Sequence, residues 1–148
     1  PLLASMFFPE LDFAQPQSRT DSWVLIRDLI FYNNTSDPFL KTIYEEYSSK
    51  QIVFELKNVE KLDTTHINQL NRYLKDEFWN FWIIFTRNSP PKNVYKNTID
   101  LWAWQRKCIL IMTDEDLKLM WQVYENKQRK PLDVINKKFV EFMRDCPS

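Results

Sequence analysis

Two short, uninterrupted apolar stretches place the tightest limit on the fold of this chain. They are Phe81 to Phe85 and Cys108 to Met112. Each has the length of a strand buried on both faces, and each is far shorter than the roughly 20 apolar residues that a membrane-spanning helix requires. The chain has 148 residues, of which 44% are hydrophobic, enough for one core. The sequence therefore predicts a single globular domain over residues 1–148 and no membrane partner.

Helical and strand-like segments alternate along the chain, which predicts an α/β protein with a central mixed sheet of four or five strands. The expected strands are residues 23–32, 51–58, 81–87 and 107–113. The expected helices are residues 36–48, 63–76 and 93–106, one that follows a cap at residues 113–116, and one that begins at residue 131. The first helix is expected as a crossover between the first two strands, whose relative direction stays open.

The start of the chain carries weaker signals. Residues 9–20 include Pro9 and Pro16 and show no periodicity, so we expect an extended connection there. Residues 2–8 look like the end of an amphipathic helix. Because Pro1 is not a genetic start and this helix is incomplete, we expect the chain to be a piece of a longer protein.

The chain contains no glycine, where average usage of about 7% would give roughly 10. Turns and helix ends that need a positive φ must therefore use other residues, chiefly Asn, Asp, Ser or Lys. We expect such turns at Asn33, Asn34, Asn58, Asn88 and Asn126. Nothing in the sequence explains the missing glycines.

Cysteine content and charge limit the functional classes. Cys108 lies inside an apolar stretch and Cys146 near the end of the chain, so both are expected to be reduced, structural thiols. No secretion signal opens the chain, and a cytoplasmic location is expected. The net charge is zero, which removes the general argument for a nucleic-acid binder but leaves room for a local basic face.

Three charged residues interrupt stretches that otherwise favour burial. Asp28 lies in the first expected strand, and Glu55 and Lys57 lie two positions apart in the second. Because side chains alternate across a strand, Glu55 and Lys57 share one face, and Asp28 can meet Glu55 if the two strands are neighbours. Burying these charges without partners would cost several kcal/mol each, so their position requires a reason.

Converging carboxylates beside a lysine suit metal-assisted phosphodiester hydrolysis. Carboxylates close together need a neutralising cation, and such hard oxygen ligands favour Mg²⁺ or Mn²⁺. A lysine nearby can orient water or stabilise charge on a phosphoryl oxygen. The plainer alternative is an ion pair between Glu55 and Lys57 on an edge strand, with Asp28 as an isolated surface residue.

With these motifs in order, the chain resembles the PD-(D/E)XK nuclease superfamily over roughly residues 8–142. The resemblance rests on IRDLIF at 26–31, IVFELKN at 52–58, INQLNRYL at 67–74 and IIFTR at 83–87. It implies a restriction-endonuclease-like fold with three layers, α/β/α, around the mixed sheet. It also implies that Asp28 and Glu55, with the carbonyl of Leu56, hold the Mg²⁺ ion, for which Mn²⁺ can substitute, and that Lys57 positions or activates water.

The resemblance suggests further contacts. Gln69 and Tyr73 are similar to the Q-x-x-x-Y pattern of some branches of the superfamily, which implies contact with nucleic acid or support of the site. Arg27 stands where the motif has proline, and Asn58 directly follows the E-x-K motif. Two basic residues after the third strand, Arg87 and Lys92, are candidates for phosphate contacts.

These features together lead to the expectation of a Mg²⁺-dependent endonuclease that cuts DNA, as a module of a bacterial restriction or anti-phage defence protein. Its expected partners are DNA and the remaining domains of a longer chain. Two alternative functions stay open: an RNA or tRNA nuclease with the same residues, and an inactive scaffold of the same fold that binds nucleic acid or protein. Whether the chain assembles as a homo-oligomer also stays open.

Overall fold

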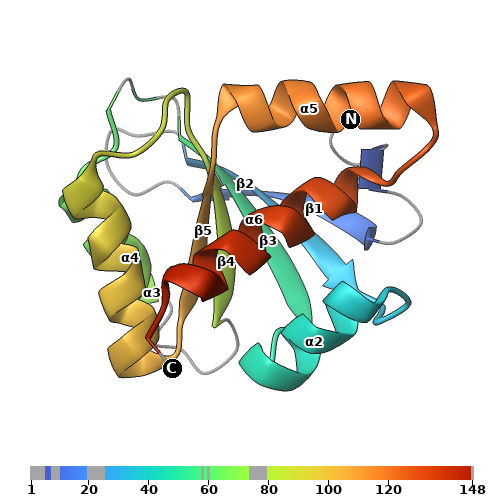
Figure 1. The fold of residues 1–148 in the computed structure, drawn as a ribbon. Coiled ribbons are helices and arrows are strands. Elements are labelled where there is room, and N and C mark those ends of the chain that lie inside the picture. The colour runs from blue at the N-terminus through green and yellow to red at the C-terminus, as the bar shows by residue number, and fades with distance from the viewer. Residues whose placement is uncertain are drawn as a thin grey trace.

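The fold of this protein comes from a computed structural model. The structure describes residues 6–7, 11–19, 26–57, 59, 61–73 and 80–147, and for residues 11–19, 26–28 and 73 it describes the backbone alone. The elements in chain order are β1 (Leu11–Arg19), β2 (Ile26–Asn33), α2 (Pro38–Tyr47), β3 (Gln51–Leu56), α3 (Thr64–Tyr73), β4 (Phe81–Phe85), α4 (Lys92–Gln105), β5 (Cys108–Met112), α5 (Asp114–Asn126) and α6 (Pro131–Asp145), as shown in Figure 1.

The described strands form one mixed sheet in the order β1-β2-β3-β4-β5. The pairs β1–β2 and β2–β3 are antiparallel, whereas β3–β4 and β4–β5 are parallel. The two parallel pairs are connected by α3 and α4, as parallel neighbours require. The prediction of an α/β protein with a mixed sheet of four or five strands is therefore confirmed.

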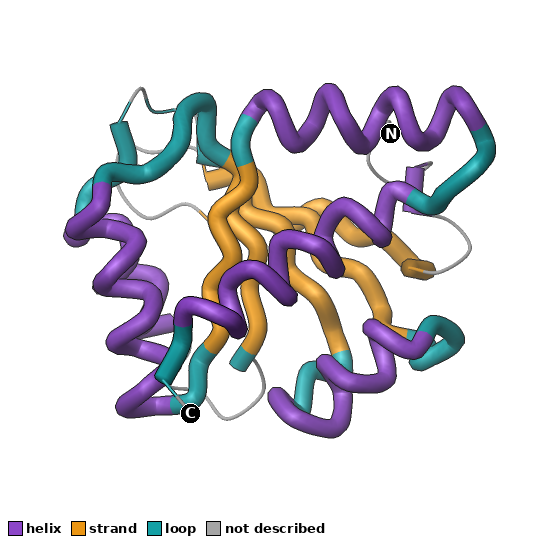
Figure 2. The backbone as a smooth tube through the Cα atoms, in the orientation of Figure 1, coloured by secondary structure: helices purple, strands orange, loops and turns teal. Residues whose placement is uncertain are grey.

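Apolar clusters cover both faces of the sheet. The larger cluster joins Phe54 and Phe81 to side chains of α2 and α6, including Phe39 and Phe139. Figure 2 shows α6 crossing this face of the sheet diagonally. The smaller cluster joins β3, β4 and β5 to α3 and α4 through residues Val53, Trp82, Ile84, Ile109, Ile67, Leu70, Val94 and Leu101. Strand residues alternate between the two clusters, so the arrangement is consistent with three layers, α/β/α.

The connection through α2 differs from the expected crossover. β2 and β3 are antiparallel neighbours, and Asn33 at the end of β2 donates its backbone N–H to the carbonyl of Lys50, 2.9 Å away, just before β3 begins. α2 therefore leaves the sheet and returns to the same edge. Its ends are fixed by a side-chain cap from Asp37 and by Ser48 in the left-handed conformation.

Asn33 joins the two ends of the segment between β2 and β3, residues 34–50, which we call the α2 excursion. Its side chain is 2% exposed, and its Nδ2 donates to the carbonyls of Leu40 at 2.9 Å and Ser49 at 3.0 Å. Its Oδ1 accepts the backbone N–H of Thr35 at 3.0 Å. One amide thus satisfies three backbone groups from both ends of the excursion, and it keeps β3 beside β2.

The expectation of an extended connection over residues 9–20 is wrong, because residues Leu11–Arg19 form β1. β1 is the outer strand of the sheet, and its register shifts between Asp12 and Gln15. An outer strand tolerates Pro16, which pairs with Leu29, since a missing N–H there need not interrupt a central ladder. The sequence pattern failed here because outer strands are partly polar and irregular.

The expected positive φ at asparagines is also wrong for the described positions. Positive φ angles occur at Thr35, Ser48, Arg106 and Lys127, and the last three end helices α2, α4 and α5. Asn34 instead shapes its turn through its side chain, which accepts hydrogen bonds from the backbone and hydroxyl of the residue two positions later. Asn58 lies outside the described residues.

Other expectations are met or fall outside the described part. Residues 21–25 and 74–79 lie outside the described part of the chain. They include the start of the first expected strand, residues 23–25, and the end of the helix expected over residues 63–76. Cys108 and Cys146 are both free, and burial raises the pKa of Cys146 to about 11. Among the described residues, no helix has the length and apolar character needed to cross a membrane.

We expect Asn33→Ala to lower the free energy of unfolding by about 2–4 kcal/mol, because buried carbonyls and an N–H lose their partner. Asn33→Asp is the matched variant, since it keeps the acceptor for Thr35 and loses the two donated bonds. Urea unfolding measures both. A loss below about 0.5 kcal/mol for both variants would show that the amide does not hold the excursion closed.

Candidate functional site

A buried ion pair lies at the end of the central strand β3. Lys57 Nζ is 3.2 Å from Glu55 Oε1, and the two residues are 8% and 3% exposed. Glu55 alternates with Phe54 and Leu56, which pack in the larger cluster, and so it shares the α3 and α4 face with Val53. The ion pair of the plainer interpretation is present, but β3 is central rather than an edge strand.

Local backbone pairing fixes both side chains. β3 ends at Leu56, but the N–H of Lys57 donates to the carbonyl of Phe85 at 2.8 Å and extends the ladder between β3 and β4. Lys57 therefore keeps the strand geometry, and its side chain falls on the face of Glu55. The same alternation directs the backbone groups of Leu56 toward β2.

The register places Asp28 opposite Glu55. Asp28 pairs with Glu55 in the antiparallel ladder of β2 and β3, and Arg27 pairs with Leu56. On the other side of Glu55, Ile84 of β4 is its partner. The sequence-based condition that the Asp28 strand be a neighbour of the Glu55 strand is therefore fulfilled, while the side chains of Arg27 and Asp28 lie outside the described part.

One oxygen of the buried pair lacks a partner. Among the described residues, Glu55 Oε2 is buried without a hydrogen bond, and so is Thr86 Oγ1, which directly follows β4. A buried, unsatisfied carboxylate oxygen is costly, and a cation or a bound water would satisfy it. Carboxylate oxygens are among the ligands that Mg²⁺ prefers, so Glu55 Oε2 is chemically suited to such an ion.

The described side chains alone do not complete a metal site. Among them, no group of three or more His, Cys, Asp or Glu residues is arranged to hold a metal ion. The side chain of Asp28 is not among those searched, so Glu55 is the one acidic residue of the expected site that the structure describes in full.

The structure does not join the candidate residues of α3 to the buried pair by a described hydrogen bond. Gln69 is exposed, whereas Ile67 and Leu70 form the buried side of α3. No hydrogen bond between Gln69 and Glu55 or Lys57 occurs among the described residues. The backbone of Tyr73 ends α3 and its side chain is outside the described part, as is all of Asn58.

The start of α3 is fixed by a reciprocal contact. The backbone N–H of His66 donates to Asp63 Oδ1 at 3.2 Å, and the backbone N–H of Asp63 donates to His66 Nδ1 at 3.1 Å. This is the pattern of a capping box, which satisfies two free N–H groups at a helix start. The N–H of His66 also holds the pKa of Asp63 below its ordinary value. The contact sets where α3 begins after the strand that carries Glu55.

A polar cleft opens at the carboxyl ends of the parallel strands. It has a volume of about 700 Å³ and is lined by Lys61, Arg87, Asn88, Ser89, Pro91 and Asp114. These residues come from the connections after β3 and β4 and, after β5, from the first residue of α5, at the edge where α/β sheets bind their ligands. Lys92 directly follows Pro91 of this lining in the sequence, and it is exposed in the first turn of α4.

Sequence reasoning identified Arg87 in this cleft and missed Lys61. The available signal was a basic residue four positions after Lys57, at the exit of the central strand. That signal is weak by itself, because most loop lysines are simply solvated.

Comparison with known proteins gives one partial similarity. Over 75 residues the chain is 33% identical to the "Putative transposon gamma-delta 80.3 kDa protein" of Escherichia coli (strain K12). The match covers 51% of this chain and 10% of that protein, so the chain spans about a tenth of the curated relative it matches. No protein-family model and no solved structure matches the chain.

We expect Lys57→Met to lower the free energy of unfolding by about 3 kcal/mol, because it leaves the Glu55 carboxylate buried without its cation. The double variant Glu55→Leu with Lys57→Met removes both charges and should be more stable than Lys57→Met alone. Lys41→Met is the control, since it breaks an exposed pair with Glu45. Urea unfolding decides the question, and equal effects of Lys57→Met and Lys41→Met would contradict a desolvated pair.

Proposed function

We propose that this chain is a Mg²⁺-dependent nuclease of the restriction-endonuclease-like fold, with DNA as its substrate. The observation that carries the proposal is the buried Glu55–Lys57 pair at the end of β3, directly opposite Asp28 in the sheet. Well-packed apolar residues often serve a core as well as a buried ion pair or better, so packing alone does not account for this pair. An acidic residue across the strand and a lysine two positions away suit phosphodiester hydrolysis.

The topology agrees with the order of motifs in the PD-(D/E)XK superfamily. The strand with Asp28 and the strand with Glu55 and Lys57 are antiparallel neighbours, and α3 and the parallel strand β4 follow. Helices pack on both faces of the sheet. This supports the finer fold assignment, which the partial similarity to a transposon protein does not address.

Each residue of the proposed site has a role in hydrolysis. Asp28, Glu55 and the carbonyl of Leu56 would hold the metal ion, and the unsatisfied Glu55 Oε2 is an available ligand. When bound, the ion lowers the pKa of a water molecule and offsets charge on the phosphate. Lys57 would orient the attacking water and stabilise the negative charge that develops on the phosphoryl oxygen. Its anchoring to Phe85 through the backbone holds it in position.

The polar cleft supplies the surface for the nucleic-acid backbone. Arg87 and Lys61 lie in it together, on loops after neighbouring strands, and Lys92 is exposed close by in sequence. Basic side chains of this kind contact phosphates and position a duplex without reading its sequence. The lining holds the two basic residues Lys61 and Arg87 against one acidic residue, Asp114, and such a small local excess of positive charge is compatible with a chain of zero net charge.

For the biological role we propose an endonuclease module of a bacterial restriction or anti-phage defence protein, acting in the cytoplasm. The matched relative is named a putative transposon protein, and proteins encoded on mobile DNA are a natural setting for DNA-cutting modules. Because the chain spans about a tenth of that relative, further domains would be its partners.

A second candidate is an inactive scaffold that keeps the fold and binds nucleic acid. The direct contact of Lys57 with Glu55 Oε1 favours it, because a carboxylate oxygen engaged by lysine is less available to a metal ion. In this case the ion pair would serve only to compensate two buried charges.

Cleavage of plasmid DNA, single-stranded DNA and RNA in Mg²⁺ or Mn²⁺ tests the proposal. We expect Asp28→Asn, Glu55→Gln and Lys57→Met each to reduce the cleavage rate by about 100-fold or more. Circular dichroism shows whether each variant is folded. Calorimetry should show metal binding that Asp28→Asn and Glu55→Gln abolish.

The matched controls are Lys41→Met and Glu45→Gln, which change an exposed lysine–glutamate pair on α2 and should cut like the parent. Cutting that survives both carboxylate changes would place the activity elsewhere. Binding of nucleic acid by the parent without any cutting would favour the scaffold, and cutting of RNA alone would change the substrate class.

A further inference from the structure

The end of the sheet that carries the proposed site holds two buried side-chain oxygens with no partner in the described part of the chain. These are Glu55 Oε2 and Thr86 Oγ1, and both residues are 3% exposed. A buried polar group without a hydrogen bond destabilises a fold, so each of these oxygens requires an explanation. Glu55 belongs to the proposed site, whereas the proposed hydrolysis gives no role to Thr86.

The backbone places Thr86 beside Lys57. The N–H of Thr86 donates to the carbonyl of Met112 at 2.9 Å, so the chain keeps strand geometry one residue beyond the end of β4. Leu56 pairs with Phe85 in the parallel ladder of β3 and β4, and the next position of this register joins Lys57 to Thr86. Neighbouring strands lie about 4.8 Å apart, which is the backbone spacing expected between these two residues.

The alternation of side chains directs Thr86 to the face of Glu55. Ile84 packs in the smaller cluster and Phe85 in the larger one, so the following residue, Thr86, returns to the face of the smaller cluster. Glu55 pairs with Ile84 and shares this face. Thr86 is thus one strand across from Glu55 and two positions further along. Strand spacing and rise separate their Cα atoms by about 8 Å, a gap that a glutamate side chain and one water molecule can span.

Packing does not require a hydroxyl at position 86. The residues of β4 that precede Thr86 on this face are Trp82 and Ile84, and both are buried in the smaller cluster. Valine has the shape of threonine and would fill the same space without a polar atom to satisfy. The hydroxyl group therefore points to a bound molecule rather than to the core.

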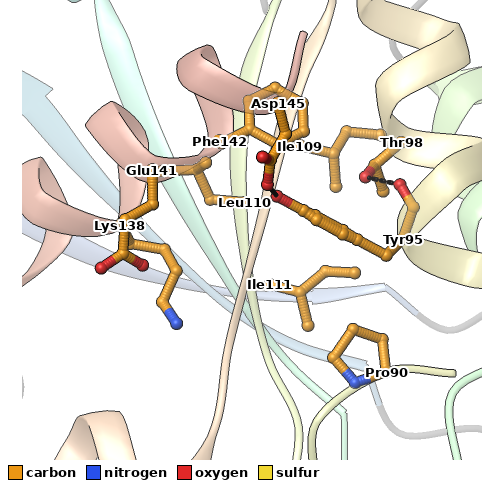
Figure 3. A pocket seen from close by; sticks show the side chains of 10 residues that line it. All are labelled: Pro90, Tyr95, Thr98, Ile109, Leu110, Ile111, Lys138, Glu141, Phe142 and Asp145. Carbon is orange, nitrogen blue, oxygen red and sulfur yellow. Dashed lines mark hydrogen bonds between the residues drawn. The ribbon is translucent and has the colours of Figure 1, made fainter. Parts of the chain in front are cut away.

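A second buried threonine shows how such a hydroxyl is satisfied within the fold. In the groove between α4 and α6, Thr98 Oγ1 donates to the carbonyl of Tyr95 at 2.6 Å, as Figure 3 shows. The Tyr95 hydroxyl in turn donates to Asp145 across the same groove. Thr86 has no such neighbour among the described residues, which makes Thr98 the matched comparison for it.

We propose that Thr86 is a positioning residue of the candidate site, whose hydroxyl and Glu55 Oε2 bind one water molecule in common beside Lys57. Buried waters typically bond to about three polar groups. This water can donate to the carboxylate and to the hydroxyl, and it can accept one of the three N–H groups of the Lys57 ammonium, which also contacts Glu55 Oε1. Both unsatisfied oxygens then gain a partner.

The bound water does not depend on the nuclease activity, whereas its role rests on the proposed function. By joining Glu55 and Lys57 to Thr86, the water would fix the orientation of both side chains. A carboxylate oxygen has two lone pairs, so Glu55 Oε2 can accept from the water and still bind a metal ion. Groups that orient metal ligands in this way affect both the affinity for the ion and the activity.

A high-resolution crystal structure of the metal-free protein tests the bound water. We expect one ordered water within hydrogen-bond distance of Thr86 Oγ1 and Glu55 Oε2. It should be absent in Thr86→Val, which loses the hydroxyl, and present in Thr86→Ser, which keeps it. The urea midpoint of Thr86→Val should fall below that of the parent, because the water loses a partner. A direct hydrogen bond from Thr86 to Glu55 or Lys57, an empty position, or a higher urea midpoint would overturn the proposal.

Metal binding and cleavage kinetics test the role. Thr86→Val should weaken Mg²⁺ binding in calorimetry and lower kcat on plasmid DNA, each by about tenfold, and leave KM for the DNA unchanged. Thr86→Ser should restore most of both losses. The control Thr98→Val removes a buried hydroxyl on α4 and should bind Mg²⁺ and cut like the parent.

The outcomes separate this proposal from the proposed function. Equal Mg²⁺ affinity and kcat in Thr86→Val and the parent would overturn the positioning role. Losses in Thr86→Ser as large as in Thr86→Val would also overturn it, because packing and not the hydroxyl would then matter. A parent that cuts no nucleic acid would contradict the proposed function, and the crystal structure and urea midpoint would still decide whether Thr86 binds the water.

Discussion

The side chain of Asn33 joins the two ends of the α2 excursion, and the position of the candidate site follows from that contact. By binding Leu40, Ser49 and Thr35, it returns the chain to the edge of β2 that it left. β3 must then run antiparallel to β2, and the register brings Asp28 opposite Glu55. The constraint acts at one end of the strand pair and the chemistry is proposed at the other. The excursion itself therefore takes no part in the site.

The central strand carries both the core and the charges. Phe54 packs in the larger cluster and Val53 in the smaller one, so β3 is buried on both faces. Glu55 and Lys57 are placed in this dry environment by the same alternation that buries their neighbours. Apolar residues at these positions would serve the core equally well or better. The fold thus tolerates a cost at the end of β3 that packing alone does not explain.

The strands and side-chain positions that depend on local sequence patterns were predicted correctly. The apolar runs of β4 and β5 and the spacing of Glu55 and Lys57 are local, and the structure agrees with each. β1 was missed because an outer strand needs no regular apolar pattern and accepts a proline. The direction of β3 relative to β2 and the place of Lys61 in the polar cleft were not predictable, because contacts between distant segments determine them.

The helix ends have a consequence for the unfolded chain. Ser48, Arg106 and Lys127 adopt the left-handed conformation without the freedom of glycine, at a cost of roughly 1 kcal/mol each. A chain without glycine, however, has fewer backbone conformations to lose when it folds. The backbone strain at these helix ends is therefore offset by a lower conformational entropy of the unfolded chain. A smaller loss of conformational entropy on folding therefore contributes to the stability of this protein.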